Sequence, residues 1–201
     1  MSINRYADLK FRGSPLKRAL KRLFWNAMRR PCRRSLGRDT YAMPGFACSA
    51  PDRLRIGARG TIGRRLKVNM LLEWFEQRFD PAVHIGDDVY IGSDCEIVSI
   101  AGITIGSGVT LSDHVYINDA SHSLDPSLGL LMDRPLRTKG PISIGDGCFI
   151  GRGAMILSGV TLGAGCIVAA AAVVRESAPP GSVLIGNPAS VSRRGERAAE
   201  A

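Results

Sequence analysis

The sequence predicts an all-β protein, a parallel β-helix in which short strands wind into about five triangular coils. Two observations predict this fold. Aliphatic residues recur every six positions from residue 56 onward, and this period fits neither an α-helix nor a simple alternating strand. The chain also holds 23 glycines, more than the usual share, and glycine suits the tight corners between short strands.

The repeat can be followed along the chain, three aliphatic positions to a coil. These positions are Ile56, Ile62, Val68; Ile85, Ile91, Ile97; Ile105, Leu111, Ile117; Ile144, Ile150, Ile156; and Leu162, Val168, Val174. Stacked coils pair as parallel strands about 4.8 Å apart, so each coil buries its aliphatic side chains against its neighbours. We expect one inward column made of Ile56, Ile85, Ile105, Ile144 and Leu162.

The five cysteines indicate neither a disulfide framework nor a zinc site, because their number is odd and no CxxC pair occurs. Cys95, Cys148 and Cys166 fall on a second inward position of the repeat, four residues after an aliphatic, where small or β-branched residues dominate. This position favours a packing role for all three thiols. Cys32 and Cys48 lie outside the repeat, and the overall usage fits a reducing cytoplasm.

Three interruptions break the repeat. One runs from about Glu73 to Ala82, a two-residue slip lies at Ile103 and Thr104, and the long one spans roughly residues 123–141. A solenoid accommodates extra residues only at its corners, where they loop outward. Loops on rigid scaffolds often carry function, so we expect the site near these insertions.

Three motifs accompany the repeat in a fixed order. Ser121-His122-Ser123-Leu124-Asp125-Pro126 opens the long interruption, Lys139-Gly140-Pro141 closes it, and Gly186-Asn187-Pro188-Ala189 ends the solenoid. From about residue 85 to residue 193 the chain thereby resembles the hexapeptide-repeat acyltransferases, in particular the maltose, galactoside and polysaccharide-biosynthesis O-acetyltransferases. The resemblance implies a left-handed β-helix, a homotrimer, and acetyl-CoA as the co-substrate.

The resemblance implies that His122 is the catalytic base. An alcohol or amine that attacks a thioester must lose its proton, and a histidine with a pKa of about 6.5 is available as a base at physiological pH. We expect direct attack within a ternary complex, without an acyl-enzyme. The alternative is that His122 is only a polar residue at the start of a loop.

Coenzyme A in the resembling enzymes lies along the solenoid edge and binds backbone atoms at positions that match Arg152 and Ala170. Each follows an inward aliphatic residue by two positions, and the two are one coil apart, so we expect them to stack on one edge. Arg193 matches the family's terminal arginine and could meet a phosphate. Glu176 stands where the family has a lysine near the nucleotide, and we therefore assign that contact to Arg175.

The sequence gives only weak signals for residues that would bind the acceptor or a metal ion. Asp94 and Asp125 are candidates for binding the acceptor, although the role of a solvated turn residue is favoured for each. The fold also hosts a zinc-dependent carbonic anhydrase with three histidine ligands. The three histidines of this chain, His84, His114 and His122, are separated by 30 and 8 residues and fall at different corners, so no metal is expected.

The positive charge is concentrated at the N-terminus. Residues 1–40 hold twelve Lys or Arg and two Asp or Glu, a charge of +10, whereas the whole chain carries +9. Ser14-Pro15 begins a predicted basic amphipathic helix, which either docks on the solenoid or a neighbouring subunit or holds the protein at an anionic membrane. Arginines without interleaved aromatic residues do not favour nucleic acid, and the apolar run Leu23-Phe24-Trp25 is too short for a signal peptide or membrane span.

These observations predict a basic arm over residues 1–50, a β-helix acyltransferase domain over residues 51–190 and a tail over residues 191–201. The function that fits best is acetyl-CoA-dependent O-acetylation of a sugar in a surface polysaccharide or its precursor, in the cytoplasm or at the inner membrane face. Acetylation of an antibiotic and a non-catalytic scaffold are the alternatives.

Overall fold

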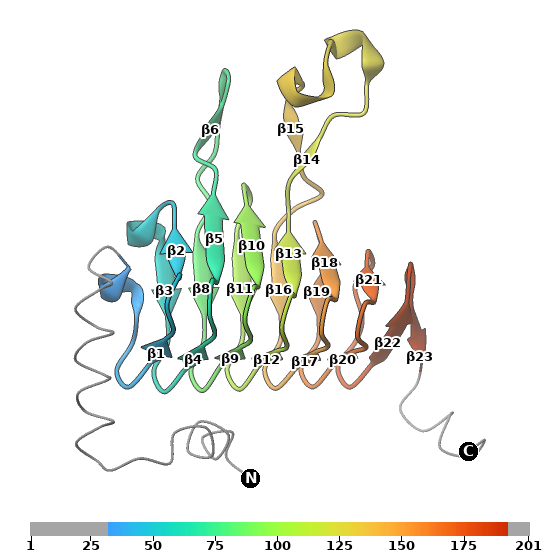
Figure 1. The fold of residues 1–201 in the computed structure, drawn as a ribbon. Coiled ribbons are helices and arrows are strands. Elements are labelled where there is room, and N and C mark those ends of the chain that lie inside the picture. Colours follow the sequence, from blue (N-terminus) through green and yellow to red (C-terminus); the bar gives the residue numbers. More distant parts are fainter. Residues whose placement is uncertain (1–31, 193–201) are drawn as a thin grey trace.

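The computed structural model describes residues 32–192 of the 201-residue chain as a triangular prism of stacked coils (Figure 1). Residues 1–31 and 193–201 lie outside the described residues. The predicted N-terminal helix that begins at Ser14-Pro15 and the candidate ligand Arg193 fall in these segments. Within the described part there is no α-helix, and the helical segments are short 3-10 turns: η1 (Arg33–Ser35), η2 (Pro51–Arg53), η3 (Pro126–Leu128) and η4 (Leu131–Asp133). The predicted all-β, left-handed parallel β-helix is confirmed.

Each of the three faces of the prism is a parallel sheet. Face A contains β3 (Leu54–Ile56), β8 (Val83–Ile85), β11 (Ile103–Ile105), β16 (Ile142–Ile144) and β19 (Thr161–Leu162). Face B contains β1 (Tyr41–Ala42), β4 (Thr61–Ile62), β9 (Tyr90–Ile91), β12 (Thr110–Leu111), β17 (Phe149–Ile150), β20 (Ile167–Val168) and β22 (Val183–Gly186), closed by the antiparallel β23 (Ala189–Ser192). Face C contains β2 (Ala47–Cys48), β5 (Lys67–Met70), β10 (Glu96–Ser99), β13 (Tyr116–Asn118), β18 (Met155–Leu157) and β21 (Val173–Val174).

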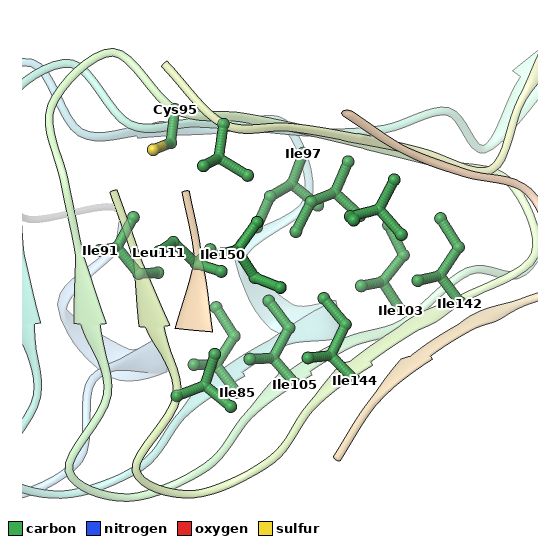
Figure 2. Packing of buried hydrophobic residues seen from close by; sticks show 14 of the residues in the cluster. Ile85, Ile91, Cys95, Ile97, Ile103, Ile105, Leu111, Ile142, Ile144 and Ile150 are labelled. Carbon is green, nitrogen blue, oxygen red and sulfur yellow. The ribbon is translucent and has the colours of Figure 1, made fainter. Parts of the chain in front are cut away.

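The predicted inward column is present. Ile56 pairs with Ile85, Ile85 with Ile105, Ile105 with Ile144, and Ile144 with Leu162, and all five side chains are buried. Figure 2 shows Ile85, Ile105 and Ile144 of this column together with the parallel column of Ile91, Leu111 and Ile150 on face B. Cys95, Cys148 and Cys166 are buried in the same core, as the repeat predicts.

The solenoid is longer than the predicted five coils. Leu36, Ala42 and Cys48 pair with Ile56, Ile62 and Val68, so residues 36–48, within the predicted arm, form a further coil. At the other end Ala178 pairs with Leu162 and Leu184 with Val168. The aliphatic pattern is weak in the sequence at these ends because most of the inward residues there are small.

The short slip is displaced from its predicted place. Ile103 and Thr104 lie within β11 and pair with Val83 and His84, and Ile103 is buried. The extra residues instead form the corner at Ile100–Gly102, before that strand. The prediction was wrong because it counted only one inward residue on this face, whereas β11 turns both Ile103 and Ile105 inward.

Both larger insertions leave the prism at the edge between faces C and A. The first is a hairpin of β6 (Glu73–Trp74) and β7 (Gln77–Arg78), and the second contains the antiparallel pair β14 (Ser121–His122) and β15 (Leu136–Arg137), with η3 and η4 between them. They project from the same side of the solenoid (Figure 1). The three edges are named A–B, B–C and C–A after the faces they join.

Candidate active site

His122 lies at the base of the long loop on the C–A edge. The strand of face C ends at Asn118, and the chain turns outward there. The side-chain oxygen of Asn118 accepts the backbone N–H of Ala120 at 2.7 Å within this turn. Two residues later His122 enters β14, where it pairs with Leu136 of β15. The imidazole is half-buried, so one side of the ring is held by protein while the other stays accessible to a ligand.

Two groups contact the His122 ring. The carbonyl oxygen of Arg134 lies 3.5 Å from Nδ1, the outer limit of a hydrogen bond, and the indole of Trp74 packs edge-on with ring centroids 5.3 Å apart. A carbonyl oxygen can only accept, so this contact favours a proton on Nδ1 and leaves the lone pair on Nε2. The arrangement orients the ring so that Nε2 is the nitrogen available to act as a base.

A buried carboxylate fixes the corner just before the site. Asp119 is fully buried and accepts the Ser99 hydroxyl at 2.7 Å, together with the backbone N–H groups of Ile100, Ala101 and Gly102 at 2.6, 3.1 and 3.0 Å. A buried carboxylate is tolerated only when its lone pairs are satisfied in this way. Asp119 therefore ties the short corner of one coil to the strand that leads to His122.

The second part of the candidate site lies on the B–C edge, where Arg152 and Ala170 stack as predicted. The carbonyl of Arg152 accepts the N–H of Ala171 at 2.8 Å, and β17 and β20 keep the two coils in register. Close stacking requires glycine at position 151, since a Cβ there would lie 2.5 Å from the nitrogen of Ala170. The edge is therefore narrow, and its backbone is open to a ligand.

Backbone donors are left free along this edge. In the lower coils each corner N–H is taken by a side chain of the next coil: that of Arg64 by the Ser93 hydroxyl at 3.3 Å, and that of Ser93 by Asp113 Oδ1 at 2.7 Å. Within residues 32–192 no such acceptor faces the N–H groups of Asp113, Arg152 and Ala170. Stacked free donors suit an extended ligand that carries amide carbonyls.

The A–B edge provides the comparison. There the N–H groups of Ala58, Asp87 and Ser107 are taken by Asp87, Ser107 and Asp146 of the next coil, at 2.8, 3.1 and 2.8 Å. Asp146 and Ala164 at the end of this row again have free N–H groups in the described part of the chain. The two edges are therefore alike in their last coils, and Ala164 is the counterpart of Ala170.

Within one chain the base and the B–C edge are apart. Face C lies between them, and its extended chain from Arg152 to the corner near Ser158 spans up to about 20 Å. Arg175 is exposed at the C–A corner after β21, and Glu176 is exposed beside it. The structure thus brings Arg152 and Ala170 together, but neither of them with His122 or Arg175.

The two acidic candidates are engaged within the chain. Both oxygens of Asp94 bind the guanidinium of Arg65, at 2.5 and 2.6 Å, and these hydrogen bonds hold the pKa of Asp94 below its usual range. Asp125 accepts the backbone N–H and the hydroxyl of Ser127 at 2.9 and 2.7 Å, which caps η3 and lowers its pKa. Asp94 lies on the B–C edge, apart from His122, and Asp125 lies in the long loop.

The remaining histidines and the cysteines lie elsewhere. His84 is exposed on face A and His114 is exposed on the B–C edge, so the three histidines occupy three different parts of the prism. Among the residues that the structure describes, no three His, Cys, Asp or Glu side chains gather as metal ligands would. Burial raises the pKa of the Cys95 thiol to about 11, which keeps it protonated and unreactive at neutral pH.

The sequence missed the role of Trp74 and of the Arg134 carbonyl. Trp74 stood out only as an aromatic residue in an interruption, and no sequence pattern says that a hairpin from one coil reaches a loop two coils away. The Arg134 contact is made by backbone, so the residue type carries no signal. The only sequence signal for the structural role of Asp119 is an acidic residue close to the inward Ile117 of the repeat.

Two segments of the chain match known repeat families. Residues 82–118 match the hexapeptide repeat of succinyl-transferase, and residues 141–176 match the bacterial transferase hexapeptide, six repeats. No curated protein sequence matches the chain. Within residues 32–192 no helix is long and apolar enough to cross a membrane.

Solved structures show the same fold. A variant of AntD, an N-acyltransferase from Bacillus cereus in complex with dTDP and coenzyme A, superposes with a TM-score of 0.68 at 17% identity, covering 82% of this chain and 85% of that one. A hexapeptide-repeat acetyltransferase from Vibrio cholerae, complexed with acetyl coenzyme A, has a TM-score of 0.54 at 27% identity over 79% of this chain and 69% of that one. A maltose O-acetyltransferase from Clostridium difficile has a TM-score of 0.53 at 24% identity, over 82% and 73%. The predicted resemblance to the hexapeptide-repeat acetyltransferases is confirmed.

Proposed function

We propose that this hexapeptide-repeat protein is an acetyl-CoA-dependent acetyltransferase that O-acetylates a sugar of a surface polysaccharide or its precursor. The observation that carries the proposal is the likeness in fold and sequence to an acetyltransferase that holds acetyl coenzyme A. The free backbone donors of the B–C edge and the oriented histidine of the C–A edge supply the two functions that such a reaction needs.

His122 is the general base of the proposed reaction. With Nδ1–H directed at the Arg134 carbonyl, Nε2 takes the proton of the acceptor hydroxyl as its oxygen attacks the thioester carbonyl. The tetrahedral intermediate then collapses, the carbon–sulfur bond breaks, and the CoA sulfur takes the proton back from His122. The acetyl ester is formed, the histidine is neutral again, and no acyl-enzyme is needed.

Coenzyme A runs along the B–C edge in this proposal. The free N–H groups of Arg152 and Ala170 donate to carbonyls of the pantetheine arm, and the narrow, glycine-lined corners let the arm lie against the backbone. Because Arg175 lies on the C–A edge, it is proposed to meet the phosphates of coenzyme A bound to the B–C edge of a neighbouring protomer, and Arg193, which lies outside the described residues, is proposed for a phosphate contact as well. The side chain of Arg152 is exposed and needs no part in binding.

The separation of base and edge supports a homotrimer. If each site combines His122 of one protomer with the B–C edge of another, three-fold symmetry closes the assembly and completes three equal sites. The B–C edge is flanked by Phe149 and Met155, which are 44% and 43% exposed in the single chain. The outward row of face A, by contrast, is polar (Arg55, His84, Thr104, Ser143 and Thr161), so faces B and C are the ones to be covered.

The acceptor binds where His122 opens to solvent. Asp94 and Asp125 could bind the acceptor only by giving up their hydrogen bonds to Arg65 and Ser127. Trp74 and the exposed apolar residues of the long loop are therefore the better candidates for lining the acceptor pocket. Residues 1–31 of the N-terminal arm, which lie outside the described residues, are proposed to hold the enzyme at the inner, anionic face of the membrane, close to lipid-linked saccharides.

The proposal is tested with purified protein, acetyl-CoA and a panel of acceptors, with release of the CoA thiol as the readout. Acceptor-dependent thiol release with sugars supports the proposal, and an ester product is cleaved by hydroxylamine whereas an amide is not. Turnover with an aminoglycoside or another antibiotic instead would favour the detoxification alternative. A protein that neither binds acetyl-CoA in calorimetry nor releases thiol would be a scaffold, and the proposal would be wrong.

A further inference from the structure

The hairpin at Glu73–Arg78 lies against the loop that carries His122, although the two insertions leave the solenoid two coils apart. They meet because the corner between them is short: the intervening coil turns through Ile100–Gly102, where Ile100 is buried. The hairpin and the long loop project from the same side of the solenoid (Figure 1), and hydrogen bonds join them across this corner.

The contact is polar and directed at β15. The side chain of Gln77 pairs with both backbone groups of Leu136: its Nε2 donates to the carbonyl oxygen at 3.0 Å, and its Oε1 accepts the N–H at 2.7 Å. Leu136 is the β-strand partner of His122 and is itself buried. Gln77 thus fixes the strand against which the histidine lies.

Trp74 contacts the histidine and its orienting carbonyl together. Its indole Nε1–H donates to the carbonyl oxygen of Arg134 at 3.0 Å, the same oxygen that lies 3.5 Å from Nδ1 of His122. The indole ring packs edge-on against the imidazole. One side chain therefore holds both the hydrogen-bond acceptor of the base and one side of its ring.

The charged side chains of the hairpin and of Arg134 do not contact the His122 ring. The Arg134 guanidinium donates to the carbonyls of Gly129 and Ser123, at 2.9 and 3.4 Å. The one ion pair within the hairpin, Arg78–Glu73, is exposed. The hairpin therefore offers His122 an indole and a shared carbonyl, and its charges are directed elsewhere.

From this geometry we infer that Trp74 is a positioning residue for His122, and that Gln77 supports it by clamping Leu136. The inference rests on the proposed role of His122 as the base. Trp74 holds the Arg134 carbonyl in place, so that Nδ1 keeps its proton and Nε2 faces the acceptor. The hairpin inserted in one coil thereby serves the reaction at another.

Steady-state kinetics separate this role from a structural one. Trp74→Ala should lower kcat by about 10- to 100-fold, a part of the 10²–10⁴ that a general base contributes, while the KM for acetyl-CoA stays within about twofold. Trp74→Phe keeps a ring but removes the N–H donor, so its kcat should lie between those of the wild type and Trp74→Ala. Glu73→Ala, which removes only an exposed ion pair of the same hairpin, is the matched control and should keep the wild-type kcat.

Fluorescence tests the contact without relying on turnover. The chain has two tryptophans, so Trp25→Phe leaves Trp74 as the only indole. The His122 imidazole packs edge-on against the Trp74 indole, so the Trp74 emission should change when the imidazole is removed. This change should appear in the Trp25→Phe, His122→Ala double variant and be absent when His84 or His114 is replaced by alanine instead.

The outcomes distinguish the inference from the proposed function. If the wild type transfers no acetyl group, the proposed function fails, and a Trp74 emission that depends on His122 would support only the Trp74–His122 contact. If His122→Ala is inactive but Trp74→Ala keeps the wild-type kcat, the base is confirmed and the positioning role of Trp74 is refuted. A Trp74 emission that does not change when His122 is removed would also refute it, and so would loss of the trimer in Trp74→Phe.

Discussion

The hydroxyl of Ser99 donates a 2.7 Å hydrogen bond to the carboxylate of Asp119, and both side chains are completely buried. The same carboxylate takes three backbone N–H groups of the neighbouring corner. This pair couples the coil that passes below the site to the strand from which His122 departs. Stability and activity should therefore both depend on it.

Asp119→Ala should lower the free energy of unfolding by about 3 kcal/mol, because it leaves the buried Ile100 N–H and the buried Ser99 hydroxyl without this acceptor and removes a hydrogen bond from the partly buried N–H groups of Ala101 and Gly102. Ser99→Ala removes one donor and leaves the carboxylate with its backbone partners, so its effect should be about 1 kcal/mol. Urea unfolding of the two variants measures the difference. Equal and small effects would show that the corner does not depend on the carboxylate.

Bulk on the B–C edge should block coenzyme A. Ala170→Tyr places a large side chain where the pantetheine arm is proposed to lie, and it should raise the KM for acetyl-CoA by about tenfold or more, the cost of losing about 1.4 kcal/mol of binding. Ala164→Tyr is the matched control, since Ala164 occupies the equivalent exposed position on the A–B edge. If Ala164→Tyr impairs binding and Ala170→Tyr does not, the cofactor lies on the other edge.

Mixed trimers should regain activity. His122→Ala protomers lack the base and Ala170→Tyr protomers bind acetyl-CoA weakly, so each homotrimer should have little activity at an acetyl-CoA concentration well below the wild-type KM. Co-expression in equal amounts should restore about one site in four. A site is intact where the protomer that supplies His122 is the Ala170→Tyr variant and the protomer that supplies the B–C edge is the His122→Ala variant. Turnover of the purified mixture measures this, and no recovery would place base and cofactor edge on the same chain.

The apolar tip of the long loop should matter only in the assembly. Leu130 and Met132 are 76% and 62% exposed in the single chain, and leaving such area in water costs about 25 cal/mol for each Å². Replacing residues 127–138 by a short glycine linker should therefore weaken the trimer or raise the KM for the acceptor, while coenzyme A still binds. It should also lower kcat, because it removes the Arg134 carbonyl and the Leu136 strand partner of His122. Light scattering and acceptor kinetics check this, and a variant unchanged in both would show that the loop is dispensable.

The sequence predicted the solenoid because its repeat is local: each hexapeptide carries its own inward aliphatic and its own corner. Where the inward residues become small, as at Ala42 and Cys48, the period persists but its hydrophobic signal fades, and the first coil was missed. Arg152 and Ala170 were placed together because one coil separates them in a regular stretch.

The surroundings of His122 could not be predicted in the same way. Trp74 approaches it only because a hairpin leans past a short corner, and the direction of an insertion depends on the packing of the whole molecule. The acceptor of its ring N–H is a backbone carbonyl, which any residue at position 134 would provide. The partner of Asp94 is Arg65, which lies in the coil below at the same corner, and this pairing depends on the coil register.

The central claim is that His122 is the base of an acetyl transfer from coenzyme A, and His122→Ala tests it most directly. Turnover is measured by thiol release with the best acceptor of the panel, and the affinity for coenzyme A by calorimetry on the same preparation. Our account predicts a fall in kcat of about 10²–10⁴, with the coenzyme A affinity and the oligomeric state unchanged. A variant that keeps a near wild-type kcat would contradict it.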